Sequence, residues 1–324
     1  MTELRLFEHN PNPPVYSDGF VETPDGFSIR YAAFRTDRNP VKGSVFLLQG
    51  RNETIEKYFE TIGDFISAGF DVATFDWRGQ GRSSRFFETS DAGYVDSFEQ
   101  YAVDAETVFR HVVLPDCRPP YFILAHSTGG LVALLLAPRM VNRIHRMVLL
   151  APFLGMPVSE RQEWLMRTAT KSMSFLGLGN LGVSNRANRR VNKPFQVNNP
   201  VTSDAHRYAR NISLPIRFPE LKLGGPSAAW VSAVFDAIDK VNDPAHLAKT
   251  IIPTLVFMAG EERVVSNEAI RQLVANLRSA SLLTIDGASH EILQEADPFR
   301  EQFFAAFNTF VPGSGPEHID KLSD

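Results

Sequence analysis

Cysteine is almost absent from the chain: Cys117 is the single one among 324 residues. An internal disulfide is therefore excluded, as is a zinc site built from paired cysteines, and a reducing compartment is favoured. Long apolar runs are also missing. The chain begins MTELRLFEHNPNPP, without a basic segment followed by an apolar stretch, and no window holds about 18 uninterrupted apolar residues. We therefore expect neither secretion nor a membrane span, and predict a cytoplasmic protein.

An excess of positive charge is missing as well. The 33 lysines and arginines stand against 37 aspartates and glutamates, which leaves a formal net charge of -4. This balance gives no electrostatic case for nucleic acid as a partner. The length is enough for one or two domains with a large core, and no segment specifies an oligomeric state. The composition is typical of a soluble globular protein.

Short runs rich in β-branched residues alternate with longer segments of helical period. The runs cover residues 44–49, 70–76, 121–125, 146–152, 253–259 and 281–286. This alternation predicts an α/β fold with a mostly parallel sheet and helices on both faces. Near the N-terminus, the pair Asp25-Gly26 separates two alternating segments, which predicts an antiparallel hairpin at the start of the sheet.

The alternation stops between about residues 153 and 242 and then resumes. We interpret this stretch as a mainly helical cap over the C-terminal edge of the sheet, where open α/β proteins keep their sites. The predicted division is a core in two parts (1–152 and 243–311), the cap (153–242) and a mobile tail (312–324). Apolar cap residues are expected either to line a tunnel or lid above the site or to pack the cap onto the core: Trp164, Leu165, Met173, Phe175, Leu176 and Trp230.

One serine stands where a predicted strand turns into a predicted helix, in the stretch LAHSTGG. A sharp strand-to-helix turn lifts the side chain at the turn above the sheet edge, and small neighbours leave room for the backbone. The pattern is that of a nucleophile elbow, GxSxG, with Ala125 in place of the first glycine. Ser127 is therefore the predicted nucleophile, the alternative being an ordinary turn residue. His126 is interpreted as a packing or loop-bonding residue.

A serine hydroxyl needs a base to take its proton and an acid to hold that base. In the elbow fold the chain order is serine, acid, histidine. His290 directly follows the last predicted strand, in DGASHEIL, where the base is expected. The loop after the strand at 253–259 reads GEERVV, so that Glu261 and Glu262 are both candidates for the acid.

The motifs QGRNETIEKY, FDWRGQGRSS, LAHSTGG, GGPSAAW, GEERVV and SHEIL occur in this order. Together they resemble the bacterial lysophospholipase and monoacylglycerol-lipase branch of the α/β-hydrolase superfamily, over about residues 19–310. The resemblance implies the α/β-hydrolase fold and a serine esterase that cleaves a single-chain lipid ester through an acyl-enzyme. It favours Glu262 as the acid, because relatives usually carry Asp directly before the RVV-like sequence. It implies neither a metal nor an organic cofactor.

The resemblance also suggests an oxyanion hole. Family members usually read His-Gly-x-x-Glu after the first central strand, where this chain reads QGRNE, beginning with Gln49. The match implies that the backbone amides of Arg51 and Thr128 receive the oxyanion. Such amides depend little on side-chain identity, so arginine is compatible with this role. Glu53 is interpreted as an internal strut of this loop.

Several other interpretations compete with this one. The sequence GLGNLG at 177–182 matches the dinucleotide pattern GxGxxG but follows no predicted strand, which argues against a nucleotide site. A basic run in the cap is interpreted as a solvated face, with lipid phosphates and peripheral contact at the inner membrane surface as the alternative: Arg186, Arg189, Arg190 and Lys193. The rival functions are a non-lipid carboxylesterase and a non-catalytic binding protein. Ser127 argues against an epoxide hydrolase or dehalogenase, since both need an aspartate at the elbow.

Overall fold

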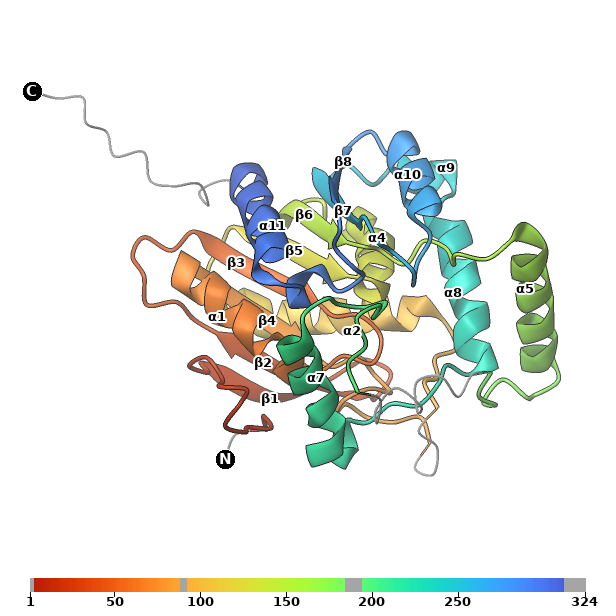
Figure 1. Ribbon diagram of the computed structural model, residues 1–324, viewed down its shortest axis with the longest axis horizontal. Helices are drawn as coiled ribbons and strands as arrows, with labels where there is room; N and C mark the ends of the chain where they lie inside the picture. The colour runs from red at the N-terminus through yellow and green to blue at the C-terminus, as the bar shows by residue number, and fades with distance from the viewer. Residues whose placement is uncertain (1–2, 88–91, 184–193, 312–324) are drawn as a thin grey trace, which may run out of the picture.

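The structure is a computed structural model that describes residues 3–87, 92–183 and 194–311. Within these ranges, eight strands form one sheet in the order β1-β2-β4-β3-β5-β6-β7-β8 (Figure 1). The strands are β1 Ser17–Glu22, β2 Ser28–Phe34, β3 Gly43–Leu48, β4 Phe70–Phe75, β5 Tyr121–His126, β6 Ile144–Leu150, β7 Thr254–Ala259 and β8 Ala280–Ile285. All six runs predicted from the sequence are strands of this sheet.

The sheet opens with the predicted hairpin and continues in parallel. β1 pairs antiparallel with β2, and β2 pairs antiparallel with β4, whereas every pairing from β4 to β8 is parallel. The hairpin turn contains Gly26 at a φ of 82°, a conformation that glycine adopts without steric cost. β8 lies at the edge of the sheet and is half exposed, unlike the fully buried β3, β4 and β7.

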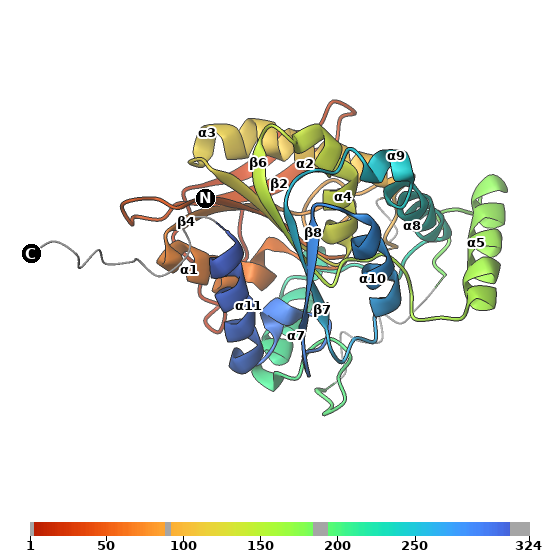
Figure 2. The same ribbon diagram turned by 90° about the horizontal axis from the view of Figure 1, so that it is seen from above.

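Helices cover both faces of the sheet because successive strand side chains point to opposite sides. Val45 and Leu47 of β3 pack toward α1 (Phe59–Ala68) and α11 (Asp297–Phe310). Phe46 and Leu48 pack toward the opposite layer, which contains α2 (Phe98–Val108) and α4 (Thr128–Met140). Figure 2 shows the two layers on either side of the sheet. The predicted fold class, an α/β-hydrolase sheet with helices on both faces, is confirmed.

The remaining helical elements are short or lie at the periphery. The second layer continues after α2 as a π-helical segment, Phe109–Val113, and α3, Leu114–Asp116. It also includes α10, Asn267–Asn276, with α9, Pro244–Leu247, beside α8. Short 3₁₀ turns occupy Ile55–Tyr58, Pro219–Leu221 and Ile292–Gln294.

Residues 153–242 contain α5 (Glu160–Phe175), α7 (Ala205–Arg217) and α8 (Ala228–Val241). α8 is largely buried and packs on α4, while α5 packs on the outer side of α8 at the edge of the molecule (Figures 1 and 2). α7 lies on the other side of the site. Its Arg207 and Arg210 form ion pairs with Glu60 of α1 at 2.5 and 2.6 Å.

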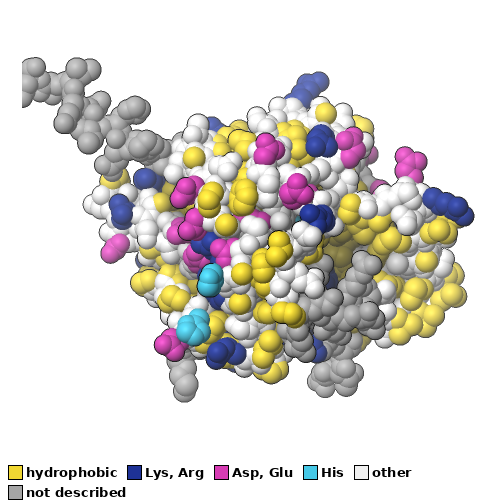
Figure 3. All heavy atoms as spheres, in the orientation of Figure 1, with side chains coloured by type: hydrophobic (Ala, Val, Ile, Leu, Met, Phe, Trp, Pro, Cys, Tyr) yellow, Lys and Arg dark blue, Asp and Glu magenta, His cyan; other side chains and the backbone are white. Residues whose placement is uncertain are grey.

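The expected lining by cap side chains holds for one residue and is wrong for the others. Trp230 of α8 lines the cavity above Ser127. The residues in and directly after α5 do not: Trp164 is 62% exposed and Phe175 is 90% exposed, with Leu165, Met173 and Leu176 also outside the cavity wall. Figure 3 shows hydrophobic side chains gathered at the edge of the molecule where α5 lies. α8 stands between α5 and the site, which is why α5 cannot reach it.

Two features from the sequence lie outside the described residues: the tail at 312–324 and the basic run Arg186, Arg189, Arg190 and Lys193. The GLGNLG segment follows α5 rather than a strand. Across the ranges that the structure describes, no helix has the length and apolar character needed to cross a membrane.

Candidate active site

A strained turn between β5 and α4 carries Ser127. The serine has a φ of 50°, a left-handed conformation that non-glycine residues rarely adopt and that costs of order 1–3 kcal/mol. The surroundings hold it there: its amide donates to the carbonyl of Leu150 at 3.0 Å, and its own carbonyl accepts from the amides of Gly130 and Phe153. Backbone strain that is held in place by surrounding hydrogen bonds is typical of functional sites.

The residues next to the serine must be small, because the backbone of α4 lies very close to neighbouring segments. A Cβ at Gly129 would lie 2.3 Å from the carbonyl oxygen of Leu48, and one at Gly130 would lie 2.8 Å from the side chain of Pro152. A side chain at either position would therefore push α4 away from the sheet. Ala125, which stands in place of the first glycine of the pattern, fits as a fully buried core residue.

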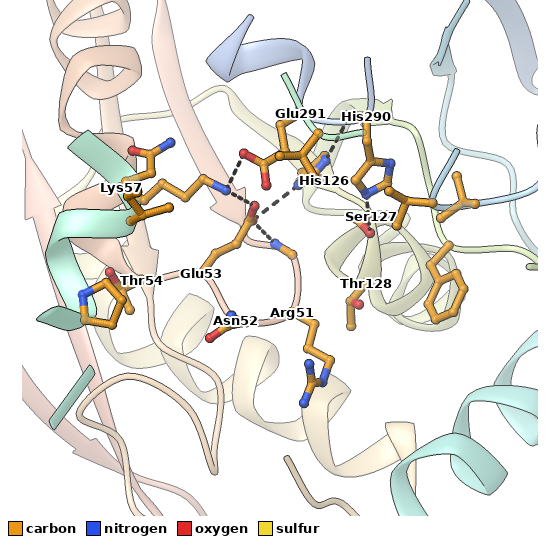
Figure 4. Close-up of a pocket in the computed structure, with 18 of the residues that line it drawn as sticks. Arg51, Asn52, Glu53, Thr54, Lys57, His126, Ser127, Thr128, His290 and Glu291 are labelled. Carbon is orange, nitrogen blue, oxygen red and sulfur yellow. Dashed lines mark hydrogen bonds and ion pairs between the residues drawn. The ribbon is translucent and has the colours of Figure 1, made fainter. Parts of the chain in front are cut away.

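The three predicted side chains meet above the sheet edge. His290 Nε2 lies 3.0 Å from Ser127 Oγ, and His290 Nδ1 lies 2.8 Å from Glu262 Oε2. Figure 4 shows the His290 ring directed at the neighbouring Ser127, with their hydrogen bond as a dashed line. The other candidate acid, Glu261, points away: its side chain is 61% exposed and its carboxylate lies 3.5 Å from Arg263. Of the two glutamates, the structure brings only Glu262 to His290.

Glu262 is held as an anion. Burial alone would raise the pKa of its carboxyl group, but the hydrogen bond and charge of His290, together with hydrogen bonds from two backbone amides, lower the pKa below its ordinary value. The backbone amides of Val264 and Val265 also donate to Oε1, at 2.7 and 3.1 Å. The ionised carboxylate of Glu262 accepts a hydrogen bond from the protonated Nδ1 of His290. The lone pair of Nε2 is then free to accept from the serine hydroxyl.

The loop from Gly50 to Glu53 lies beside the serine, and Glu53 holds it in shape. Its Oε2 accepts from the Gly50 amide and from the Tyr58 hydroxyl, and its Oε1 pairs with Lys57 at 2.6 Å. Burial alone would raise the pKa of Glu53, but Lys57 and then His126 hold it well below its ordinary value. Glu53 is thus an ionised strut, as its sequence context suggested.

The backbone amides of Arg51 and Thr128 are among those in this region that have no hydrogen-bond partner within the described residues. Thr128 is the first residue of α4, where unpaired amides and the positive end of the helix dipole favour negative charge. Arg51 is fixed between Gly50 and Asn52, whose amide donates to Gln80 at 2.7 Å. Free donors beside a serine are suited to a developing oxyanion.

His126 connects the oxyanion loop to His290. Its Nδ1 lies 3.2 Å from Glu53 Oε2, and its Nε2 lies 3.2 Å from the backbone carbonyl oxygen of His290. Both partners are acceptors, so that satisfying both requires a proton on each nitrogen. Burial alone would lower the pKa of His126, but the Glu53 carboxylate outweighs burial and raises it. His126 is therefore a loop-bonding residue, as expected, and it bonds two parts of the site at once.

Lys57 and Glu291 belong to the same network and were missed by the sequence analysis. Lys57 Nζ lies 2.6 Å from Glu53 and 2.8 Å from Glu291, which is the neighbour of His290 (Figure 4). The only local signal was the spacing of Glu53 and Lys57, four residues apart. The pairing of Lys57 with Glu291 joins segments 234 positions apart, so no local pattern could have shown it.

The serine faces a cavity of about 420 Å³. Charged groups line one side, where the Glu53 network lies. Most of the remaining wall is apolar and comes from the segment after β6, from α7, from α8 and from the loop after β7: Phe153, Met156, Ile212, Leu214, Pro215, Trp230, Val264 and Val265. Polar residues also line it, among them Asn52, Thr54, Tyr208 and Asn211. The described residues contain no group of three His, Cys, Asp or Glu side chains able to hold a metal ion.

Comparison with known proteins agrees with this architecture. Residues 39–297 match the model of the family described as serine aminopeptidase, S33. The chain is 31% identical over 287 residues to lysophospholipase L2 of Escherichia coli strain K12, across 85% of this chain and 82% of that protein. It is 30% identical over 286 residues to the probable lysophospholipase L2 of Haemophilus influenzae, across 87% of this chain and 88% of that protein.

Solved structures extend the likeness of the fold. A soluble variant of monoglyceride lipase from Saccharomyces cerevisiae aligns with a TM-score of 0.71 at 17% identity, across 96% of this chain and 98% of that structure. A carboxyl esterase from Bacillus coagulans aligns with a TM-score of 0.71 at 18% identity, across 91% and 98%. At such identities these two support the fold alone. The family match and the identity to the two lysophospholipases go further: the chain belongs to the serine aminopeptidase S33 family of α/β-hydrolases.

Proposed function

We propose that the protein is a serine hydrolase that cleaves the carboxylic ester of a single-chain lipid, a lysophospholipid or a monoacylglycerol. One observation carries the proposal. The hydrogen-bonded series Ser127, His290 and Glu262 opens into a cavity whose walls are mostly apolar. The serine supports acyl transfer, and the apolar walls suit an acyl tail. The relatives named lysophospholipase support the same substrate class.

In the proposed reaction, Ser127 Oγ attacks the ester carbonyl while His290 Nε2 takes its proton. The carbonyl oxygen becomes an oxyanion and receives hydrogen bonds from the amides of Arg51 and Thr128, each worth roughly 3 kcal/mol in such sites. Glu262 stabilises the imidazolium. The intermediate collapses, His290 protonates the departing glycerol-type alcohol, and an acyl-enzyme remains. Water, deprotonated by His290, then attacks the acyl carbonyl and releases the fatty acid.

Residues 153–242 are proposed to act as the cap that encloses the acyl tail. α7 and α8 approach the cavity from two sides, and their apolar residues provide the contacts: Ile212, Leu214, Pro215 and Trp230. Each methylene that becomes buried there contributes about 0.8 kcal/mol of transfer free energy. The part of the cap that contributes is α7 with α8, in place of the α5 residues expected from the sequence.

The test is a series of glycerol monoesters and lysophospholipids of increasing acyl length, assayed below their aggregation limits. kcat/KM should rise steeply from acetyl esters to long-chain esters, until the cavity is filled. A lipid with two acyl chains serves as the control and should be a poor substrate. A flat dependence on length, or a preference for acetyl esters, would favour the non-lipid carboxylesterase instead.

We further propose that the cap contacts the lipid surface from which the substrate is drawn. The support is the outer face of α5, where Trp164 and Phe175 are exposed to solvent. Exposed aromatic residues are favoured at membrane interfaces, because their rings are amphipathic or apolar. Replacing both residues by serine should weaken co-sedimentation with phosphatidylglycerol vesicles. Equal sedimentation of the two proteins would refute a role of α5 in lipid contact.

A further inference from the structure

Arg51 is partly exposed, and it differs in its charge partners from the arginines that are fully buried. Arg30 is paired with Glu56 at 2.8 Å and with Asp76 at 2.6 Å. Arg78 is similarly held by two carboxylates, at 2.5 and 2.6 Å. This is the general rule for buried charges, since an unpaired one loses hydration without compensation. Within the described part of the chain, Arg51 forms no ion pair with a carboxylate.

The guanidinium of Arg51 also has donors to spare. Its Nη2 donates to the carbonyl oxygen of Gly224 at 2.6 Å, while its Nε is buried without a hydrogen-bond partner. A guanidinium carries five N–H donors in a planar fork. Loss of hydration lowers the pKa of Arg51 to about 10, which still leaves it a cation at neutral pH. The hydrogen bond to Gly224 uses one donor of the guanidinium, but it does not compensate the positive charge.

The surroundings hold this side chain in one place. A Cβ at Gly93 would lie 2.5 Å from Arg51 Nη2, so the glycine leaves the space that the guanidinium occupies. Gly93 is in turn bonded to the segment that carries the Gly224 carbonyl, through the Gly225 carbonyl and the Ser227 amide. The ring of Trp230 lies 5.2 Å from the guanidinium carbon, within cation–π range. The fork is therefore preorganised.

Arg51 lines the same cavity as Ser127 and His290. The other charged groups there neutralise one another, because Lys57 and His126 face Glu53, and Lys57 also faces Glu291. Among the described residues that line the cavity, Arg51 is thus the one cation without an anion. Its backbone amide belongs to the proposed oxyanion hole. An anion bound to the Arg51 guanidinium would therefore lie about the length of one arginine side chain from the ester carbonyl at the backbone amide.

We propose that the Arg51 guanidinium binds the phosphate of a lysophospholipid head group and so selects phosphate-bearing substrates over monoacylglycerols. This inference rests on the proposed lipid hydrolase function. The phosphate is the anion that such a substrate offers near the ester, because its phosphorus lies four bonds from an sn-2 ester oxygen and five bonds from an sn-1 ester oxygen. A guanidinium matches phosphate oxygens in a bidentate manner. A monoacylglycerol offers no charge and leaves the Arg51 guanidinium without an anion.

The experiment compares lysophosphatidylglycerol with monoacylglycerol, both carrying the same acyl chain, in wild type, Arg51→Met and Arg51→Lys. The measured quantity is the ratio of kcat/KM for the two substrates, which is insensitive to a general loss of activity. A hydrogen bond to a charged group contributes about 1.5–3 kcal/mol, so the ratio should fall roughly 10- to 100-fold in Arg51→Met. Arg51→Lys should retain part of the preference, since it keeps the charge and loses the fork.

A second measurement tests phosphate binding without relying on lysophospholipid turnover. Glycerol 3-phosphate should inhibit wild-type hydrolysis of the monoacylglycerol competitively, whereas glycerol at the same concentration should not, and Arg51→Met should lose this inhibition. An unchanged substrate ratio in Arg51→Met would overturn the proposal, as would equal inhibition of wild type and variant. If the wild type cleaves neither lipid, the proposed function fails. If it cleaves both and the ratio does not move, only the role of Arg51 fails.

Discussion

Replacing Glu262 by glutamine tests the proposed acid with the smallest change in shape. The wild-type carboxylate uses Oε2 to accept from His290 Nδ1 at 2.8 Å and Oε1 to accept from two backbone amides. A glutamine has one oxygen and one NH₂ group, so it can serve only one of the two sides. If the oxygen stays with the amides of Val264 and Val265, the NH₂ group faces His290.

Facing an NH₂ group, His290 Nδ1 must be the acceptor, and the ring proton moves to Nε2. That nitrogen lies 3.0 Å from Ser127 Oγ and can then no longer take the hydroxyl proton. The wrong tautomer in the chymotrypsin-type triad lowers kcat about 10⁴-fold, and we expect a loss of this order here. The opposite orientation keeps an oxygen against His290 Nδ1, but it places the NH₂ group against the two N–H groups of Val264 and Val265, which repels them. The imidazolium also still lacks a negatively charged partner.

The assay is the kcat of purified Glu262→Gln on a long-chain monoester, with the melting temperature as a check on folding. Glu261→Gln is the matched control, since it makes the same chemical change on a side chain that is mostly exposed and does not contact His290. We expect the control to keep nearly full activity. A reversal of the two effects, or less than a tenfold loss in Glu262→Gln, would refute the assignment of the acid.

Two further predictions concern the rest of the site. Ser127→Ala should fold normally and lose turnover on the order of a million-fold; His290→Ala should fall about as far and the double variant little further, because the members act as a unit. Single-turnover hydrolysis measures this, and additive losses in the double variant would contradict it. Glu53→Gln should lower the free energy of unfolding by roughly 3 kcal/mol at pH 7, since it weakens a buried ion-pair network, and urea titration measures the difference. Because the pKa of Glu53 is held well below its ordinary 4.5, the stability that its charge contributes is present above that value and is lost as the pH falls through the folded-state pKa, so the difference should shrink in acid. A difference that stays constant from pH 7 into the acid range would show that the charge is not its source.

The fold could be predicted from the sequence because its signals are local. Each of the six apolar runs is long enough for a strand, and β3, β4 and β7 are buried along their whole length. The hairpin was visible in Asp25-Gly26, and the structure places Gly26 at the positive φ that such a turn requires. The alternation of runs with helical segments then leaves few topologies other than a parallel sheet.

The cap could not be predicted in the same detail. An apolar stripe on a helix indicates that some surface will cover it, but not which surface. α5 and α8 both carry apolar residues, and only the tertiary arrangement decides that α8 faces the core with Trp230 while α5 leaves Trp164 exposed. The residues of α7 that line the cavity, such as Ile212, were overlooked for the same reason.

The candidate site shows a similar division. The strand-to-helix turn at Ser127 and the loop positions of Glu262 and His290 follow from chain order, and the structure brings these three side chains together, while their catalytic roles stay predictions. Lys57 and Glu291 could not be found, because an ion pair between distant segments leaves no periodic trace. A buried network of this kind becomes visible only when the partners of each charge are known.

The two proposed roles of Arg51 have a joint consequence for how the substrate would be chosen. The guanidinium that binds the phosphate and the amide that receives the oxyanion belong to one residue, which is held on both sides by Gly224 and by the loop that Glu53 braces. A head group fixed to the fork would therefore place the ester carbonyl against the amide, so that its binding energy is used to orient the reacting atoms. The preference for lysophosphatidylglycerol should then appear mainly in kcat, measured under saturating conditions, rather than in KM. A preference confined to KM would mean that the head group binds without aligning the ester, and that the side chain and the amide of Arg51 act independently.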